Sequence, residues 1–124
     1  MEKVSKILLV DDDGFMLTMV GRLLSARGFN VTVADTAVAI LDTVAEYTPD
    51  VIIMDNEMPV VSGHQAILEL KSNSNTRGIP IIYFSSVYNL AELARNAGAD
   101  AYLSKTDILD NIDDIIRLID QLKP

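Results

Sequence analysis

Short apolar runs alternate with helical patterns along the whole of this 124-residue sequence, and no other feature restricts the possible folds as much. Two runs, Val51 to Met54 and Ile79 to Phe84, are almost continuously apolar, as expected of strands that are covered on both faces. The expected strands are Ile7 to Val10, Val31 to Ala34, Val51 to Met54, Ile79 to Phe84 and Ala101 to Leu103. Strands this short and this apolar predict a sheet in the interior of the molecule.

Between these runs, apolar residues recur at the spacing of one helical face. Ser62 with Gln65 three residues later predicts a capping box at the start of one helix. The apolar stripes are Leu17, Val20 and Leu24 before Gly28; Ala37, Leu41 and Val44; Leu90, Leu93, Ala94 and Ala97 before Gly98; and Ile108, Ile112, Ile115, Ile119 and Leu122. Five strand–helix units with short connections predict an α/β fold: a doubly wound, five-stranded parallel sheet with five flanking helices. We expect one domain over residues 1–124.

Composition excludes several classes of function. The formal net charge of −8 would repel phosphate backbones, so direct binding of nucleic acid is not expected. The chain has no cysteine, which excludes disulfides and thiol chemistry. The first apolar run, Ile7 to Val10, is too short for a signal peptide or a membrane span, so we expect a cytoplasmic protein that does not contact membranes.

Acidic side chains follow the expected strands at the points where the strands end. Asp11 and Asp12 follow the first strand and Asp55 ends the third. If these two strands are neighbours, the three carboxylates converge at the carboxyl edge of the sheet. Carboxylates this close repel one another unless a cation joins them, and a hard divalent ion such as Mg²⁺ prefers oxygen ligands. Ser85 after the fourth strand and Lys105 after the fifth add a hydroxyl and a positive charge, a combination that suits phosphoryl transfer.

The same segments resemble the receiver domain of two-component response regulators, a chemotaxis-regulator-like superfamily, over essentially the whole chain. The segments that carry the resemblance are Ile7–Asp13, Val51–Gly63, Ile79–Ser86 and Ala97–Lys105. They are similar to the first-strand acidic motif, the phosphoacceptor motif with its Met-Pro pair and later glycine, the switch-hydroxyl strand and the lysine motif. The resemblance implies a flavodoxin-like fold with strand order 2-1-3-4-5.

The resemblance also implies a role for each site residue. Asp55 is expected to accept a phosphoryl group from a histidine kinase or phosphotransfer protein. The chain would then be a signalling domain and not an enzyme. Mg²⁺ is expected on Asp12, on Asp11 through water, on Asp55 and on the backbone carbonyl of Glu57. Ser85 is expected to hydrogen-bond the phosphoryl group, and Tyr102 to turn inward when Ser85 moves.

The expected output of such a switch lies on the face formed by the fourth helix, the fifth strand and the fifth helix. In the family this face contacts an effector, an output domain or a second copy in a dimer. The segment from Ser85 to Lys105 is about two residues shorter than is common in the family, which affects this surface. Thr106 stands where the family usually has a proline after the lysine, and we expect the Lys105–Thr106 peptide to be cis nonetheless.

Two alternatives compete with this interpretation. Asp11 to Gly14 also matches the start of haloacid-dehalogenase-type phosphatases, in which Asp11 would be the nucleophile and Asp13 the acid; the simpler reading of Asp13 is a helix cap. A second alternative is a receiver-like docking module that takes no phosphate. No Gly-x-Gly-x-x-Gly follows the first strand, so a dinucleotide-binding role is not expected.

Overall fold

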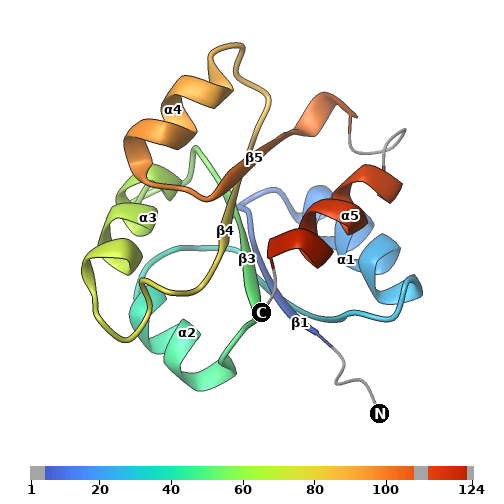
Figure 1. Cartoon of the computed structure of the whole chain (residues 1–124), viewed down its shortest axis with the longest axis horizontal. Coiled ribbons are helices and arrows are strands. Elements are labelled where there is room, and N and C mark those ends of the chain that lie inside the picture. Colours follow the sequence, from blue (N-terminus) through green and yellow to red (C-terminus); the bar gives the residue numbers. More distant parts are fainter. Residues whose placement is uncertain (1–4, 108–111, 123–124) are drawn as a thin grey trace.

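Five parallel strands form one sheet with the order β2-β1-β3-β4-β5, as predicted (Figure 1). The structure is a computed structural model, and it describes residues 5–107 and 112–122. The strands are β1 (Lys6–Val10), β2 (Asn30–Ala34), β3 (Val51–Asp55), β4 (Ile81–Ser85) and β5 (Ala101–Ser104). The helices are α1 (Gly14–Ala26), α2 (Ile40–Tyr47), α3 (Gly63–Ser72), α4 (Leu90–Ala97) and α5 (Ile112–Leu122). The fold is the expected flavodoxin-like α/β arrangement.

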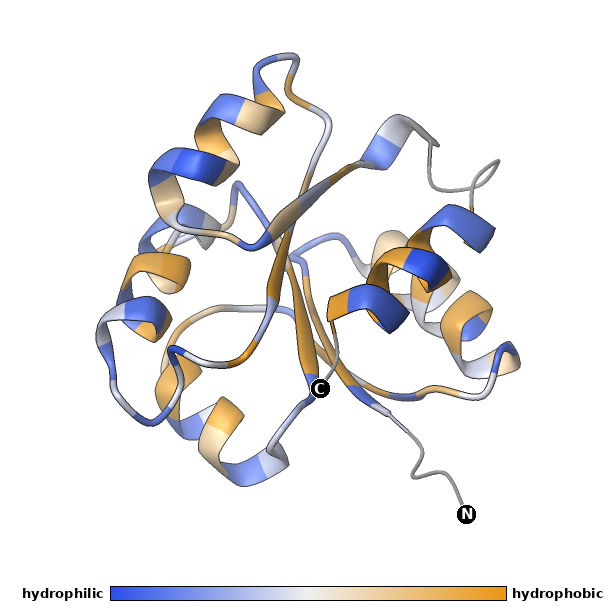
Figure 2. Cartoon of the chain, viewed as in Figure 1, coloured by the Kyte–Doolittle hydropathy of each residue, from blue (hydrophilic) through white to orange (hydrophobic). Residues whose placement is uncertain are grey.

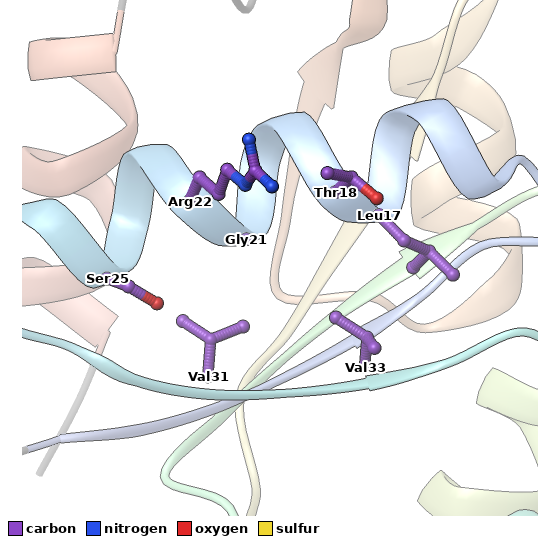
Figure 3. Close-up of a pocket in the computed structure, with 7 residues that line it drawn as sticks. All are labelled: Leu17, Thr18, Gly21, Arg22, Ser25, Val31 and Val33. Carbon is purple, nitrogen blue, oxygen red and sulfur yellow. The ribbon is translucent and has the colours of Figure 1, made fainter.

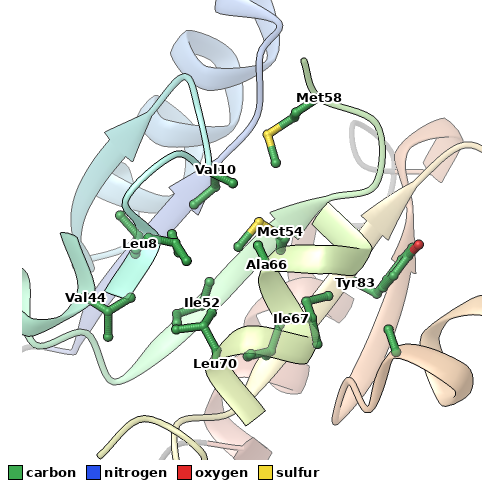
Figure 4. Close-up of a cluster of buried hydrophobic side chains, with 14 of the residues drawn as sticks. Leu8, Val10, Val44, Ile52, Met54, Met58, Ala66, Ile67, Leu70 and Tyr83 are labelled. Carbon is green, nitrogen blue, oxygen red and sulfur yellow. The ribbon is translucent and has the colours of Figure 1, made fainter. Parts of the chain in front are cut away.

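The sheet divides the core into two apolar layers. Helices α2, α3 and α4 cover one face, and α1 and α5 cover the other (Figure 1). Alternate residues of β3 enter opposite layers: Ile52 and Met54 contact the α2–α3–α4 layer, shown in Figure 4, while Val51 and Ile53 contact the α1–α5 layer. Because both faces of β3 and β4 are covered, every residue of these two strands is buried.

The apolar stripes of the helices turn inward as their spacing predicted, and the polar faces remain outside (Figure 2). Leu17, Val20 and Leu24 are the buried residues of α1. On α5, Ile115 and Ile119 are buried, whereas the expected stripe residue Ile108 lies outside the described residues. No helix among the described residues has the length and apolar character needed to cross a membrane.

Several boundaries differ from the sequence-based expectations. Strand β4 begins at Ile81 and not at Ile79, because Pro80 has no N–H to donate to a sheet ladder; its carbonyl still accepts the N–H of Ile52 at 3.0 Å. Helix α2 begins only at Ile40, after Ala39 with a φ of 59°. The buried Ala37 therefore belongs to the preceding loop, although its side chain does contribute to the core.

The edge strand β2 is the least covered strand. A groove of about 380 Å³ lies between it and α1, lined by Gly21 and Arg22 of the helix and by Val31 and Val33 of the strand (Figure 3). A side-chain carbon added at Gly21 would lie 3.7 Å from Val33 Cγ1, so the absence of that carbon keeps the groove open. No residue of β2 is fully buried, whereas every residue of β3 and β4 is.

The start of α3 packs directly against the end of β3. Gly63, the first residue of α3, donates its N–H to the Asn56 carbonyl at 2.8 Å, and a Cβ at Gly63 would lie only 1.7 Å from the Asp55 carbonyl oxygen. The Ser62 hydroxyl accepts the N–H of Gln65 at 3.1 Å, which caps the helix as the sequence predicted. The glycine is therefore a steric requirement of the segment that carries Asp55.

We predict that Gly63→Ala destabilises the protein by about 3 kcal/mol, because the new methyl group overlaps backbone that cannot rotate away. Urea unfolding followed by circular dichroism measures the free energy of unfolding. Gly78→Ala is the matched control, since a Cβ at Gly78 meets no atom within 4 Å. Equal stability of the two variants would contradict the close approach.

Candidate phosphoacceptor and metal site

The acidic residues predicted from the strand ends do converge. Strands β1 and β3 are adjacent, and one carboxylate oxygen from each of Asp11, Asp12 and Asp55 can be chosen so that all three lie within 4.8 Å of one another. Asp11 is completely buried and Asp55 is 5% exposed, whereas Asp12 is exposed to solvent. The site therefore has two acids in its floor and one at its rim.

Lys105 places its ammonium group between the two buried acids. Its Nζ lies 2.8 Å from Asp11 Oδ2 and 2.8 Å from Asp55 Oδ1. The same Nζ lies 5.3 Å from the centroid of the Phe84 ring, so the aromatic face supports the lysine from the side. One side chain from the end of β5 thus neutralises part of the charge contributed by the ends of β1 and β3.

Asp11 is held in a single orientation by the backbone that follows it. Its Oδ1 accepts the N–H of Asp13 at 2.9 Å. Its Oδ2 accepts no well-directed hydrogen bond from the described residues, although the Lys105 ammonium is within ion-pair distance. A buried carboxylate oxygen in this condition is costly unless a cation satisfies it.

The electrostatic balance of the site is visible in two pKa shifts. The pKa of the Asp55 carboxyl is raised from 3.8 to about 6: burial is the largest cause, the charges of Asp11 and Asp12 act in the same direction, and Lys105 opposes them. Burial alone would lower the pKa of the Lys105 ammonium, but its contacts with Asp11 and Asp55 outweigh burial and raise that pKa above 10.5. Three carboxylates and one ammonium still leave an excess of negative charge.

A divalent cation fits this arrangement. Carboxylate oxygens are the ligands that Mg²⁺ prefers, and Asp11, Asp12 and Asp55 present three of them at one point. The incompletely satisfied Asp11 Oδ2 and the excess of carboxylates over ammonium groups both indicate a site whose charge is not balanced by Lys105 alone. The acidic triad is of the kind that receiver domains use for Mg²⁺.

The acids open into a cleft of about 310 Å³, large enough for a phosphoryl group and a hydrated ion. Asp12, Asp55, Glu57, Ser85 and Lys105 line it. The Ser85 hydroxyl accepts the N–H of Val87 at 3.3 Å, which ties it to the loop before α4. Two of the predicted site residues do not line the cleft: Asp11 is completely buried, and Tyr102 is 52% exposed on β5.

The expectation of a cis bond between Lys105 and Thr106 is wrong, because no peptide bond among the described residues is cis. Lys105–Asp107 form a 3₁₀ turn, and the Ser104 hydroxyl holds it by accepting the Thr106 N–H at 3.3 Å; the Ser104 and Thr106 hydroxyls lie 2.7 Å apart. Lys105 reaches both carboxylates from this trans backbone. The chain thus avoids the cost of about 2.5–4 kcal/mol of a cis bond before a residue other than proline.

Asp13 is a helix cap. Its Oδ1 accepts the N–H of Phe15 at 2.9 Å and that of Met16 at 3.4 Å, which is the N-cap arrangement at the start of α1. The structure confirms the helix-cap reading of Asp13, whose side chain also lines the cleft beside Asp12 and Asp55.

Comparison with known proteins agrees with the geometry. The family model for the response regulator receiver domain matches residues 7–117. The chain belongs to the response regulator receiver family. It is a phosphoacceptor signalling domain with an acidic pocket, not an enzyme in the ordinary sense.

Curated relatives include the response regulator MprA of Mycobacterium sp. (strain KMS), 32% identical over 86% of this chain and 46% of that protein. MprA of Mycobacterium leprae (strain TN) is 33% identical over 96% of this chain and 53% of that protein. The receiver domain described here therefore spans about half the length of these relatives.

Similar solved structures include a chemotaxis protein and the receiver domain of a sensor histidine kinase. The chemotaxis protein CheY4 of Vibrio cholerae superimposes with a TM-score of 0.85 at 24% identity, covering 97% of this chain and 99% of that one. The receiver domain of the sensor histidine kinase PA1611 from Pseudomonas aeruginosa PAO1 gives a TM-score of 0.85 at 25% identity, covering 97% and 98%. The latter structure has a magnesium ion coordinated in its active site cleft.

One contact at the site was not foreseen. The Tyr83 hydroxyl donates a hydrogen bond to the side-chain carbonyl of Asn56, the residue after Asp55. A signal existed in the sequence: a tyrosine within an otherwise apolar strand requires a partner for its hydroxyl. The partner was not identifiable, because it depends on the register of β4 beside β3.

The raised pKa of Asp55 leads to a prediction about stability. An acid whose pKa is higher in the folded state than in the unfolded chain destabilises the fold when ionised, so this penalty is small near pH 4 and complete well above pH 6. Without Mg²⁺, Asp55→Asn should raise the free energy of unfolding at pH 8 by about 3 kcal/mol, and much less at pH 4. Urea unfolding at both pH values, with chelator present, measures the difference. A variant less stable than wild type at pH 8 would contradict the assigned electrostatics.

Proposed function

We propose that Asp55 is the phosphoacceptor of this receiver domain. The observation that carries the proposal is the bridge of the Lys105 ammonium to Asp11 and Asp55, at 2.8 Å each, beside an open cleft. Asp55 is the only member of the triad that both ends a central strand and lines the cleft. Its carboxylate is fixed by Lys105 and accessible to a donor.

We propose Mg²⁺ as the metal, held by the carboxylates of Asp11, Asp12 and Asp55 and by the backbone carbonyl of Glu57. Glu57 supports this assignment because it lines the same cleft, two residues after Asp55. When bound, Mg²⁺ neutralises negative charge that develops on the transferring phosphoryl oxygens. The magnesium ion in the related PA1611 receiver supports the choice of metal.

The reaction is an in-line transfer from phosphohistidine to carboxylate. An oxygen of Asp55 forms a bond to phosphorus while the phosphorus–nitrogen bond of the donor breaks, and the imidazole leaves with the bonding electron pair. Lys105 stabilises the additional negative charge on the phosphoryl oxygens. The raised pKa of the buried Asp55 does not prevent attack, because the carboxyl is still mostly ionised at pH 7.

Phosphorylation then favours a second conformation of the domain. The phosphoryl group adds roughly −1.5 to −2 charge and three acceptor oxygens. The Ser85 hydroxyl accepts the Val87 N–H at 3.3 Å, and its own O–H donates to an oxygen of the phosphoryl group. A shift from 1:99 to 99:1 requires about 5.5 kcal/mol. A few charge-assisted hydrogen bonds of about 1.5–3 kcal/mol each supply it.

The output surface is the α4-β5-α5 face. Tyr102 lies on β5 in register with Tyr83 of β4 and is half exposed, so its side chain is not held in the core and turns inward when the end of β4 moves. We propose that this change controls an effector protein, an output domain or a dimer formed through the same face.

The family implies a histidine kinase as partner. We propose that a sensor histidine kinase or a phosphotransfer protein supplies the phosphoryl group. We propose that residues 1–124 form one receiver domain. Because the chain spans about half of the curated relatives, an effector or output domain outside it is consistent with the proposal.

The lack of cysteine is compatible with a reducing cytoplasm.

We predict that incubation with Mg²⁺ and acetyl phosphate yields one phosphoryl adduct by intact mass spectrometry, and that chelation of the metal abolishes it. Asp55→Asn should abolish the adduct because the attacking oxygen is replaced by an amide. Asp13→Asn is the matched control: it retains the capping oxygen of α1 and should retain the adduct. An adduct that persists in Asp55→Asn, or is lost in Asp13→Asn, would overturn the assignment.

A further inference from the structure

The segment that follows Asp55 is held at its first residue from two directions. The Asn56 backbone carbonyl accepts the Gly63 N–H at 2.8 Å, which closes the loop between β3 and α3 at its base. The Asn56 side-chain carbonyl accepts the Tyr83 hydroxyl from the neighbouring strand. Few rotations of the backbone between Asp55 and Glu57 are compatible with both bonds.

The two bonds restrain a loop that is strained further along. Val60 has a φ of 71°, an unfavourable conformation for a β-branched residue, and the Val61 N–H bonds to the Pro59 carbonyl at 2.8 Å to form a tight turn. Such a turn costs free energy, so the loop needs anchors to keep one shape. The Asn56 contacts are anchors at the end nearest the site.

Tyr83 is a rigid donor. Tyr83 is fully buried in the apolar layer beneath α3 and α4, and it pairs with Met54 of β3 in the sheet. Figure 4 shows its hydroxyl at the rim of that layer. Burial raises the pKa of the phenol, and the charges of Asp55 and Glu57 act in the same direction, so the hydroxyl keeps its proton. A neutral donor also adds no charge to an acidic cleft.

We propose that Tyr83 and Asn56 are positioning residues for the metal site: their hydrogen bond restrains the backbone that leads from Asp55 through Asn56 to Glu57, so that the Glu57 carbonyl and the Asp55 carboxylate face the same ion. This inference rests on the proposed function, because it concerns the ligands of the proposed Mg²⁺. The mechanism is preorganisation. Outer contacts that orient a ligand contribute to metal affinity although they never touch the metal.

The pair acts on metal binding and leaves the chemical step alone. Neither side chain lines the cleft, so neither contacts the phosphoryl group. Loss of the bond therefore weakens Mg²⁺ binding without changing the rate of phosphorylation once the metal is saturating. A purely structural role would lower stability and leave the magnesium affinity unchanged.

Tyr83→Phe removes only the hydroxyl and retains the buried ring. We expect the dissociation constant for Mg²⁺, measured by titration calorimetry without phosphodonor, to rise about tenfold. Asn56→Ala should produce a similar rise, and the double variant no further rise, because both remove one bond. The rate with acetyl phosphate at saturating Mg²⁺ should stay within about twofold of wild type.

Tyr47→Phe is the matched control. Tyr47 also donates its hydroxyl to an oxygen in another element, the Asn30 carbonyl at 2.7 Å, but at the opposite end of the sheet from the acids. This variant should lose stability and keep the wild-type magnesium affinity. A Tyr83→Phe affinity equal to that of Tyr47→Phe, or additive losses in the Asn56–Tyr83 double variant, would overturn the proposal.

A second measurement separates this inference from the proposed function. Without any metal, hydrogen exchange at the Gly63 amide reports on the base of the loop, because that amide bonds to the Asn56 carbonyl. Tyr83→Phe should accelerate this exchange about fivefold relative to Tyr47→Phe. If wild type failed to bind Mg²⁺, the proposed function would fall. Unchanged exchange at Gly63 would overturn the positioning role in either case.

Discussion

The repulsion among three carboxylates at the carboxyl edge of the sheet is the constraint around which the site is organised. A parallel sheet with β1 beside β3 places Asp11 and Asp55 next to each other in a buried position, where ionised groups are costly. Lys105 offsets part of that cost by contacting both acids, and a cation in the cleft would offset the rest. With Lys105 and a metal ion in place, the site has enough positive charge to accept the negatively charged phosphoryl group.

The backbone around Asp55 explains how such a site keeps its shape. Gly63 approaches the Asp55 carbonyl so closely that no side chain fits, and its amide anchors the loop at Asn56. The strained Val60 turn lies between these two points. Close packing of α3 on the end of β3 therefore restrains the backbone that carries Asp55, and does not merely stabilise the helix.

The lysine turn shows that different local chemistry can reach the same geometry. The expected cis bond before Thr106 is absent, and the hydroxyls of Ser104 and Thr106 stabilise a 3₁₀ turn in its place. The requirement that matters is the position of Lys105 Nζ relative to Asp11 and Asp55. The resemblance to the family predicted that Lys105 would lie at the acidic site. Because Thr106 replaces the usual proline, a different backbone turn holds the lysine there.

The sequence by itself determined the five strand–helix units, the parallel sheet and the residues of the acidic pocket, because apolar period and the position of polar residues at strand ends are local properties. It could not determine that Lys105 contacts two acids at once or that Tyr83 bonds to Asn56. Those facts depend on which residues face one another across strands far apart in the chain. Only the register and twist of the folded sheet set these distances, so the tertiary structure alone decided them.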